Sequence, residues 1–310
     1  MIETEIGNFK AHKVDDEDFR KSVIGLCNTL ILKEHKIIFP GPMAVSIERA
    51  NFETLRRNFY WVCEKSDGVR YILFVSMFQY GGKSHKMCFL INRSLEVFLV
   101  SMCFPIEVYR GTVMDGELVQ KNDGSWSFLV FDCMCIGGEY IKDKCLSERL
   151  SHTREMLTYL DVGKSCLGVA LKNFVPLQSF EEYVATMVPT GYQNDGFVFT
   201  PENTVLGPGR SDALFKLKPQ SHHTVDFLVN NRGDACVWDN IKYKKITTLN
   251  LPPEMKKSMR SGGAIVECMW TGSKWVPVMI REDKNRPNNK LTLDKTLLNF
   301  MENIQLKELY

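Results

Sequence analysis

The stretch YWVCEKSDGVRYILF, Tyr60–Phe74, contains two apolar runs separated by a short polar turn. Both runs are rich in β-branched and aromatic residues, which is typical of strands, and Gly68 permits a tight turn between them. Lys65 therefore lies in a strand that otherwise resembles buried sequence. A buried ammonium group is costly unless it is paired or has a chemical task. The K-x-D-G pattern alone is still better explained by a surface hairpin with a lysine at its tip, because four-residue patterns recur by chance.

The segments around this turn alternate between strand and helix patterns. Short runs rich in β-branched and aromatic residues fill residues 60–135 and return in DGFVFT and LFKLKP, with Gly, Asn, Asp or Ser between them. Apolar residues recur with helical spacing elsewhere, and Ser46 stands where a helix N-cap would be placed. Helices are predicted over residues 18–34, 46–59, 147–160 and 179–189. We therefore predict an α+β fold in which the first domain contains antiparallel sheets.

A second set of short strands follows Pro219. The runs TVDFLVNN, ACVWDN, GAIVECMWTG and KWVPVMIRED are separated by turn signals, a pattern typical of a small β-barrel. The final segment, LDKTLLNFMENIQLKELY, has the spacing of an amphipathic helix that runs to the C-terminus. We expect residues 1–221 to form the first domain and residues 222–302 the second. Residues 303–310 are expected to end the C-terminal helix and to pack back on the first domain.

Composition and charge narrow the classes of function. The 310 residues are 44% hydrophobic and 25% charged, as in ordinary soluble proteins, and the formal net charge is only +2. A near-neutral chain argues against a long sequence-independent footprint on DNA and favours recognition of a few phosphates. The ten cysteines are scattered without zinc-site spacing, which favours reduced thiols in a cytosol-like compartment. The polar N-terminus and the lack of a membrane-length apolar stretch predict a soluble, intracellular protein with no membrane partner.

Charged residues recur on the strand-like segments in a fixed order along the chain. The series is Lys65, Asn92-Arg93, Asp115-Gly116-Glu117, Asp195-Gly196-Phe197-Val198, Lys216-Leu217-Lys218 and Arg281-Glu282-Asp283-Lys284. Taken singly, each member has an ordinary explanation: a turn residue beside a glycine, a solvated strand face or a surface charge at a strand end. Chance explains the ordered set poorly, because every member lies on a β-type segment.

The ordered set resembles the motifs of the covalent nucleotidyltransferases, which include capping guanylyltransferases, DNA ligases and RNA ligases. The segments that resemble capping guanylyltransferases in particular are PGPMAVSIER (Pro40–Arg49), LFKLKP followed by HHTVDF (Leu214–Phe227), and REDKNRPN (Arg281–Asn288). Ala44 departs from the family pattern, which has proline there. The likeness is greatest to the enzymes of large algal DNA viruses, so the nucleus or a cytoplasmic virus factory is the expected compartment. It implies a DNA-ligase-like (ATP-grasp-like) nucleotidyltransferase domain followed by an OB-fold β-barrel.

The resemblance implies a reaction that transfers GMP from GTP to the 5′-diphosphate end of RNA, forming the GpppN cap and releasing pyrophosphate. Lys65 would attack the α-phosphorus to give a lysyl-N-GMP intermediate, and neighbouring cations would favour its neutral, nucleophilic form. Glu117 and Asp195 would bind Mg²⁺ or Mn²⁺ through hard oxygen ligands. The metal would neutralise charge on the pentavalent phosphorus while pyrophosphate leaves in line.

The resemblance also implies further contacts with GTP. The cations that would contact the ribose or the phosphates are Arg70, Arg93, Lys216 and Lys218. Phe131 would stack on guanine, although a buried phenylalanine of the core explains it equally well. Ser66 or Lys172 would donate a hydrogen bond to guanine O6. The other members of the implied GTP site are Lys65, Asp67, Gly68 and Asp226.

The distal motif is implied to act on the leaving group. Arg281, Asp283 and Lys284 would reach the β- and γ-phosphates when the second domain closes over the first. Closure would assemble the site and expel water, and reopening would expose lysyl-GMP to RNA. These three residues complete the implied catalytic set with Lys65, Arg70, Arg93, Lys216 and Lys218.

The main rival is an ATP-dependent polynucleotide ligase that acts through lysyl-AMP. Ligases need extended basic surface to track a duplex, and they lack the R-x-D-K-x-x-P-N form of the distal motif. A non-catalytic nucleic-acid-binding module or a protein scaffold would leave the ordered ionisable residues unexplained. No pattern of an RNA triphosphatase or of a methyl-donor-binding fold is present, so we expect separate chains to act as RNA triphosphatase and cap methyltransferase.

Overall fold

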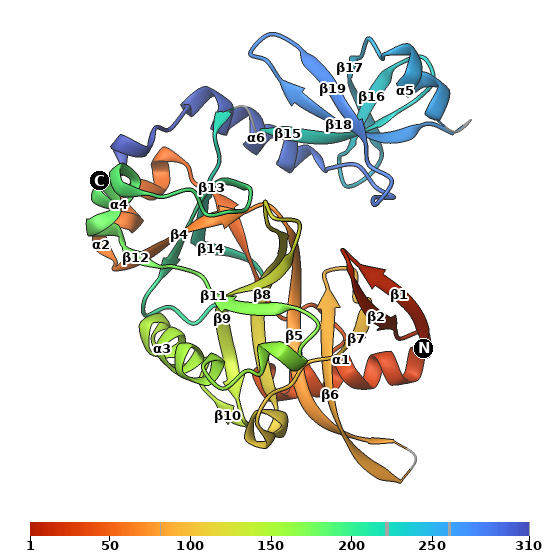
Figure 1. Ribbon diagram of the computed structural model, residues 1–310. Coiled ribbons are helices and arrows are strands. Elements are labelled where there is room, and N and C mark those ends of the chain that lie inside the picture. The colour runs from red at the N-terminus through yellow and green to blue at the C-terminus, as the bar shows by residue number, and fades with distance from the viewer. Residues whose placement is uncertain (81, 221–222, 260–261, 310) are drawn as a thin grey trace. The chain divides into compact units, whose positions relative to one another are not determined.

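The K-x-D-G turn joins two different sheets. β4 (Tyr60–Ser66) ends in one sheet, and β5 (Val69–Tyr80) begins in another. The protein is described by a computed structural model over residues 1–80, 82–220, 223–259 and 262–309. Within these residues β4 and β5 do not pair, so the turn is a crossing between sheets and the surface-hairpin explanation is excluded (Figure 1).

The larger sheet contains nine strands within the described residues, in the order β1-β2-β7-β6-β5-β8-β9-β10, with β11 beside β9. The β9–β11 pair is parallel and the other neighbours are antiparallel. Besides β5, its strands are β1 (Ile2–Ile6), β2 (Phe9–Lys13), β6 (Lys83–Asn92), β7 (Val97–Val100), β8 (Thr112–Gln120), β9 (Trp126–Ile136), β10 (Glu139–Tyr140) and β11 (Gly168–Leu171). The predicted antiparallel sheet is confirmed.

Apolar side chains cover both faces of this sheet. Two predicted helices are confirmed here, α1 (Glu17–Leu32) and α3 (Leu146–Leu157). α1 contributes Val23 to a buried cluster that includes Phe74 of β5. α3 contributes Met156 to a second buried cluster and contacts β9 and β11. The sheet is therefore held rigidly between two apolar cores, which fixes the strands that carry Arg70 and Glu117.

The second sheet has the order β12-β4-β13-β14-β3. Its other strands are β12 (Val175–Pro176), β13 (Asn194–Pro201), β14 (Gly209–Leu217) and β3 (Pro42–Ser46). α4 (Phe180–Thr186) packs here, with the Phe180 ring 4.9 Å from Phe197 and 5.7 Å from Phe199 of β13. The strands predicted in DGFVFT and LFKLKP are confirmed as β13 and β14.

The predicted helix over residues 46–59 is largely wrong. Only Phe52–Arg57 forms an α-helix, α2, and Ser46 ends strand β3 instead of capping a helix. Tertiary contacts explain the difference, because the Ile47 carbonyl accepts a hydrogen bond from Asn299 at 2.9 Å. Short 3-10 turns occur at Arg49–Asn51, Ile106–Arg110, Val162–Lys164, Leu177–Ser179 and Leu306–Glu308.

The C-terminal part forms a third sheet with the order β17-β16-β15-β18-β19. Its strands are β15 (Thr224–Val229), β16 (Asp234–Trp238), β17 (Tyr243–Thr248), β18 (Ala264–Trp270) and β19 (Trp275–Ile280). Val225, Phe227 and Val266 lie at its core, which is flanked by α5 (Pro253–Ser258) and α6 (Lys290–Glu302). No β17–β19 pairing closes the sheet within the described residues, so closure into an OB-fold barrel stays a prediction.

The predicted helix to the C-terminus is too long. α6 ends at Glu302 because Asn303 adopts a left-handed conformation with φ of 42°, which ends a helix. The chain then forms the 3-10 turn Leu306–Glu308.

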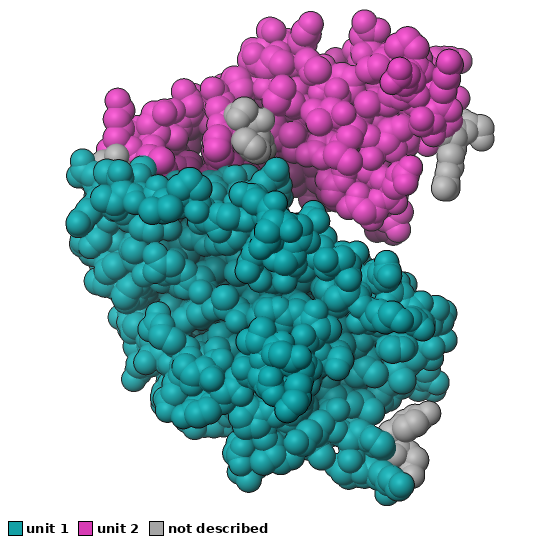
Figure 2. Space-filling view, viewed as in Figure 1, with its two compact units in different colours: residues 1–45, 54–216, 310 teal, residues 46–53, 217–309 magenta. Residues whose placement is uncertain are grey.

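The chain divides into two compact units (Figure 2). Unit 1 holds residues 1–45 and 54–216, and unit 2 holds residues 46–53 and 217–309. The predicted domain boundary between residues 221 and 222 lies outside the described residues. Residues 46–53 contact α6 through the Lys295–Glu48 ion pair at 2.6 Å. No helix within the described ranges is long and apolar enough to cross a membrane.

Candidate active site

Lys65 lies at the C-terminal end of β4 and forms an ion pair with Asp195 of β13. The Nζ–Oδ1 distance is 2.6 Å, and the two side chains are 21% and 8% exposed. β4 and β13 are antiparallel, and their register shifts between Asn194 and Phe197. Gly196, with φ of 127°, occupies this bulge in a conformation that side chains disfavour. The bulge aims the Asp195 carboxylate at the lysine.

Glu117 of β8 approaches the residue next to Lys65. The Ser66 hydroxyl donates to the Glu117 carboxylate at 3.0 Å, and the Ser66 side chain is fully buried. Gly68 permits this approach, because a Cβ there would lie 2.3 Å from the Leu118 carbonyl oxygen. The Asp67 amide donates to the Gln193 carbonyl at 2.9 Å, which ties the turn to the segment before Asp195. The K-x-D-G turn thus brings two carboxylates to consecutive residues, Lys65 and Ser66.

Arg70 is engaged by protein groups. Its guanidinium binds both Asp115 oxygens, at 2.8 and 2.5 Å, and donates to the Pro42 carbonyl at 2.6 Å. Burial lowers the pKa of Arg70, but the adjacent Asp115 raises it above its ordinary value. A Cβ on Gly41 would lie 2.4 Å from this guanidinium, so the Pro40–Pro42 segment needs glycine at its centre. The contact of Arg70 with GTP stays a prediction.

Phe131 and Lys172 lie beside these groups. The Arg70 guanidinium is 5.2 Å, and the Lys172 ammonium 5.8 Å, from the centre of the Phe131 ring. Lys172 is 4% exposed, and its ammonium donates to the Glu64 carbonyl oxygen at 3.1 Å. The ring that was expected to meet guanine is therefore bordered by two cations. The contacts of Phe131, Lys172 and Ser66 with guanine stay predictions.

The remaining implied cations lie on separate elements. Lys216 is in β14, and Lys218 follows the end of that strand. Arg93 follows β6 on the surface, with one guanidinium nitrogen 3.4 Å from the Met43 sulfur. The roles of these three residues toward GTP stay predictions.

Glu64, the residue before Lys65, is a buried carboxylate that the family resemblance did not assign to the site. Glu64 is 2% exposed, and it accepts hydrogen bonds from the hydroxyls of Tyr183, at 3.2 Å, and Tyr192. Burial and the nearby Glu64 raise the pKa of Tyr183 to about 12. Tyr192 precedes β13, so Glu64 connects β4 to the segment that carries Asp195. A charged residue inside the apolar run YWVCEK was the signal that could have revealed it.

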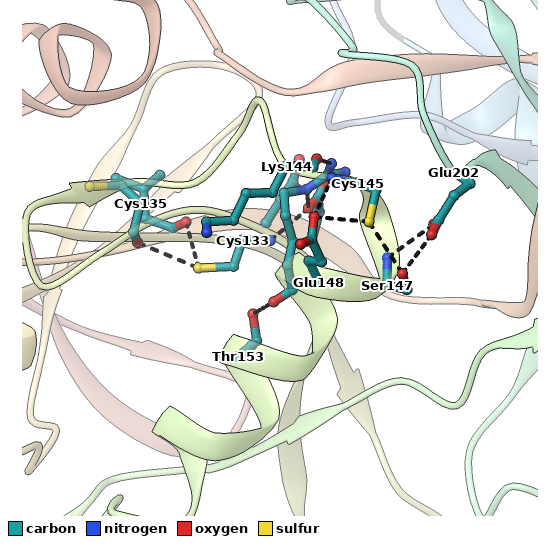
Figure 3. A network of polar contacts seen from close by, with 12 residues as sticks. Cys133, Cys135, Lys144, Cys145, Ser147, Glu148, Thr153 and Glu202 are labelled. Atoms are coloured by element: carbon teal, nitrogen blue, oxygen red, sulfur yellow. Dashed lines mark hydrogen bonds and ion pairs between the residues drawn. The ribbon is translucent and has the colours of Figure 1, made fainter.

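A polar network supports the opposite end of the same strands. Figure 3 shows Glu202 turned toward Ser147, whose amide and hydroxyl donate to its carboxylate at 3.0 and 2.5 Å. The Trp61 indole donates to the same carboxylate at 2.7 Å. Burial tends to raise the pKa of Glu202, but the bonds from Ser147 and Trp61 lower it below its ordinary value. This network joins α3 to the start of β4, through Trp61, and to the residue after the end of β13, Glu202.

The distal motif lies within unit 2 and is occupied by internal ion pairs. Arg281 pairs with Asp283 at 2.7 Å and with Asp226 and Glu267 at 3.4 Å each. Lys284 also binds Asp226, which is 4% exposed. The bond to Asp283 raises the pKa of Arg281, and Arg281 lowers the pKa of Asp283. The structure thus places Asp226, Arg281, Asp283 and Lys284 together.

Glu117 and Asp195 fit a divalent-metal site of the kind that phosphate ligands complete. Both are hard oxygen donors, and each is hydrogen-bonded to one of two consecutive residues. Across the described part of the chain, no group of three or more His, Cys, Asp or Glu side chains could hold a metal ion. Mg²⁺ is commonly held by one or two carboxylates together with substrate phosphates and water. The pair therefore suits a metal that arrives with a nucleotide.

The sequence matches two family models in succession. The model described as "mRNA capping enzyme, catalytic domain" matches residues 2–220, and "mRNA capping enzyme, C-terminal domain" matches residues 211–310. The mRNA-capping enzyme subunit alpha of Saccharomyces cerevisiae is 24% identical, covering 92% of this chain and 80% of that protein. The Neurospora crassa protein of the same name is 29% identical, over 64% of this chain and 55% of that protein.

A zebrafish relative and a solved structure extend these matches. The mRNA-capping enzyme of Danio rerio is 26% identical, and the alignment covers 81% of this chain and 45% of that protein. The chain thus spans about half the length of the Neurospora and zebrafish relatives. A mycobacterial DNA ligase D complexed with ATP and MES is similar with a TM-score of 0.44 and 12% identity, over 79% of this chain and 95% of that one. That weak likeness carries no conclusion about activity.

The family matches decide between the two enzymes that the sequence left open. The capping models cover the whole span from residue 2 to residue 310. They confirm the prediction of an mRNA-capping nucleotidyltransferase, a guanylyltransferase, over that of a polynucleotide ligase. The chain belongs to the mRNA capping enzyme family, with the catalytic domain followed by the C-terminal domain.

Proposed function

We propose that Lys65 is the nucleophile with which this guanylyltransferase takes GMP from GTP. The single observation that carries the proposal is the 2.6 Å bond between the partly buried Lys65 and Asp195. Ser66, the next residue on the strand, is bonded to Glu117. In the first step a P–N bond forms between Lys65 and the α-phosphorus, and the bond to pyrophosphate breaks. In the second step an oxygen of the RNA 5′-diphosphate attacks that phosphorus. The P–N bond then breaks and the amine is restored.

Asp195 is proposed to have two alternating partners. In the structure its carboxylate holds the Lys65 side chain, with an Nζ–Oδ1 distance of 2.6 Å. Asp195 and Glu117 would hold Mg²⁺ or Mn²⁺ through their carboxylate oxygens when the ion arrives with GTP. A bound divalent cation would supply charge neutralisation at the α-phosphate. Lys65 would then be positioned but no longer paired.

The remaining roles concern GTP and its leaving group. We propose that Arg93, Lys216 and Lys218 contact the phosphates or the ribose, and that Phe131 with Ser66 or Lys172 recognises guanine. Arg70 is proposed to act mainly by fixing the Pro40–Pro42 segment, because its donors already have protein acceptors. Asp283 holds Arg281 through their ion pair at 2.7 Å, and Arg281 and Lys284 are proposed to bind the β- and γ-phosphates. They would exchange Asp226 for phosphate oxygens when the two units close on GTP.

The wider setting of the enzyme is also proposed. The transfer requires RNA with a 5′-diphosphate, so a separate RNA triphosphatase would precede this enzyme and a cap methyltransferase would follow it. The motif likeness to enzymes of large algal DNA viruses supports a viral origin. The compartment would then be the nucleus or a cytoplasmic virus factory.

Covalent labelling tests this function directly. The protein is incubated with α-³²P-labelled GTP or ATP and a divalent metal, and the products are separated on a denaturing gel. We expect an acid-labile label from GTP only, abolished by Lys65→Ala and discharged by 5′-diphosphate RNA. Label from ATP would instead make the enzyme a ligase, and label retained in Lys65→Ala would remove the nucleophile assignment.

A further inference from the structure

Two aromatic rings stand exposed on one hairpin of unit 2. Trp238 at the end of β16 and Tyr243 at the start of β17 are directly paired across the hairpin and are 38% and 50% exposed. Their ring centroids are 5.2 Å apart in an edge-to-face arrangement. β17 is an edge strand of its sheet (Figure 1). Two exposed rings in contact form a small apolar patch, which makes the hairpin a candidate binding surface.

The turn between the rings is rigid. Asp239 accepts the amides of Ile241 at 3.1 Å and Lys242 at 2.8 Å, and its own amide donates to the Lys242 carbonyl at 3.1 Å. Asn240 takes the left-handed conformation that this turn needs, with φ of 78°. The Asp239 carboxylate thus forms its hydrogen bonds within the turn. Ile241, at the tip, is 84% exposed. The rings are held in place before any partner arrives.

The hairpin is basic as well as aromatic. Tyr243 is flanked in sequence by Lys242 and Lys244, both exposed, while the next lysine, Lys245, is neutralised by Asp234. Within the described residues no ion pair is found for Lys242 or Lys244. Aromatic rings interleaved with cations are the common composition of single-stranded nucleic-acid sites, because bases stack on rings and phosphates bind ammonium groups.

Backbone contacts connect the hairpin to the distal motif. The Trp238 amide donates to the Asn288 carbonyl at 3.1 Å. Asn288 also exchanges two hydrogen bonds with Asp226, each 2.8 Å long. Asp226 is the carboxylate that binds Arg281 and Lys284. The two exposed rings are therefore attached to the segment that is proposed to handle phosphates.

We propose that the β16–β17 hairpin binds the first unpaired nucleotides of the RNA substrate. Trp238 and Tyr243 would stack on bases, and Lys242 and Lys244 would contact phosphates. The inference rests on the proposed function for its substrate, a 5′-diphosphate RNA. Stacking on rings is tolerant of sequence, so this surface would bind RNA by length and charge more than by base identity.

RNA affinity as a function of length tests the proposal. Fluorescence anisotropy with 5′-diphosphate oligoribonucleotides of about 2, 6 and 12 nucleotides would compare the normal protein with the double variant Trp238→Ala/Tyr243→Ala. We expect the normal protein to gain affinity with length and the variant to lose about tenfold or more for the longest RNA. Trp238→Phe/Tyr243→Phe, which keeps two rings, should restore most of this loss. Adduct formation from GTP, which needs no RNA, should be unchanged.

Matched controls separate this effect from general damage. Tyr159→Ala removes an aromatic side chain that is 63% exposed in unit 1 and should leave RNA affinity unchanged. Lys242→Gln/Lys244→Gln should reduce the slope of log affinity against log salt by about 1.4, or about 0.7 for each phosphate contact. Lys256→Gln/Lys257→Gln on α5 provides the charge-matched control.

The outcomes distinguish this proposal from the proposed function. Unchanged affinity for the longest RNA in the hairpin variants would overturn it, as would an equal loss in the Tyr159→Ala control. Loss of a protein partner with normal RNA binding would also overturn it, because the surface would then serve a protein. If the normal protein forms no adduct but binds RNA through the hairpin, the proposed function fails and the RNA site stands.

Discussion

The two regions that carry the motifs hold their charges in different ways. In unit 1, Lys65 and Asp195 lie on paired strands and Glu117 lies on a strand of the larger sheet. Each polar bond joins distant parts of the chain. In unit 2, the Arg281 guanidinium binds Asp283, only two residues away, and shares Asp226 with Lys284. One region is a site whose geometry is set by sheets. The other is a cluster in which cations are paired with carboxylates of the same unit.

Under the proposed function, the two regions require different changes of partner. Strand pairing fixes the positions of Lys65 and Asp195, so the proposed attack would need only local rotation of the lysine side chain. Arg281 and Lys284 are neutralised by protein carboxylates, so binding of phosphates requires an exchange of ion pairs. Cations that are paired in this way suit a step that occurs only when a highly charged ligand replaces their carboxylate partners.

The largest effect is expected from the carboxylates of unit 1. Asp195→Ala and Glu117→Ala should each slow lysyl-GMP formation by about 10²–10³-fold, because each removes a proposed ligand of the metal that neutralises the reacting phosphate. The rate is measured as labelled adduct against time at several Mn²⁺ and Mg²⁺ concentrations. A shifted metal dependence is expected along with the slower rate. Full adduct formation in Asp195→Ala would contradict the proposal, because the Lys65–Asp195 pair would then be unnecessary for the reaction.

Arg281→Ala is expected to divide the two half-reactions. Adduct formation should fall by about 10²-fold, because a cation on the leaving group is lost. Transfer from adduct formed in advance should keep its normal rate, because pyrophosphate has already left by then. Adduct made with excess protein and metal, then isolated and chased with 5′-diphosphate RNA, provides the measurement. A normal yield in this variant would remove the distal motif from the first step.

A smaller difference between the two regions is expected in the free energy of unfolding. Arg70→Met leaves Asp115 buried and unpaired, and such losses cost about 3–5 kcal/mol in the free energy of unfolding. Arg281→Met leaves Asp226 with Lys284 as a remaining partner, so we expect a loss of about 1 kcal/mol. Urea denaturation of both variants gives the comparison. Equal losses would mean that the unit 2 ion pairs are as structural as those of unit 1.

The smallest effect is expected in acid. The pKa values of Glu202 and Asp283 are both lowered in the folded protein, the first by Ser147 and Trp61 despite burial, the second by Arg281. Each carboxylate therefore stabilises the fold above its unfolded-state pKa, and this stability is lost as pH falls through the lower folded-state value. Tm measured between about pH 7 and 3 should fall less steeply below about pH 4.5 in Glu202→Gln than in the normal protein.

Asp283→Asn provides the control for this pH dependence. Its carboxylate is 63% exposed, so water and salt screen its interaction with Arg281. We expect its Tm profile to differ little from that of the normal protein. A steeper acid loss in Glu202→Gln would contradict the assigned direction of the Glu202 pKa shift.

Much of the fold could be predicted because local patterns carry it. The α+β class, helices α1 and α3, and strands β13 and β14 follow from the spacing of apolar residues. The N-terminal hairpin β1–β2 is not among the predicted strands, since its two short runs alternate with exposed charges. The helix expected at residues 46–59 fails because Ile47 and Glu48 are held by α6, far along the chain.

The sequence by itself determined the class of chemistry. The order of Lys65, Glu117, Asp195 and the distal R-x-D-K motif needs no coordinates, because the identity and spacing of charged residues are written in the chain. It also identified the capping family, which the family models confirm. The proposed function depends on Lys65.

The tertiary structure decided which charges meet. It alone showed that Arg70 is bound by Asp115, that Glu64 holds two tyrosines, and that Arg281 is stored against carboxylates of its own unit. It also placed Trp238 and Tyr243 together on an exposed edge. The physical reason is that periodicity reports only which face of a strand or helix is buried. Partners distant in sequence are chosen when sheets cross and pack, and their pairing depends on geometry that no local pattern contains.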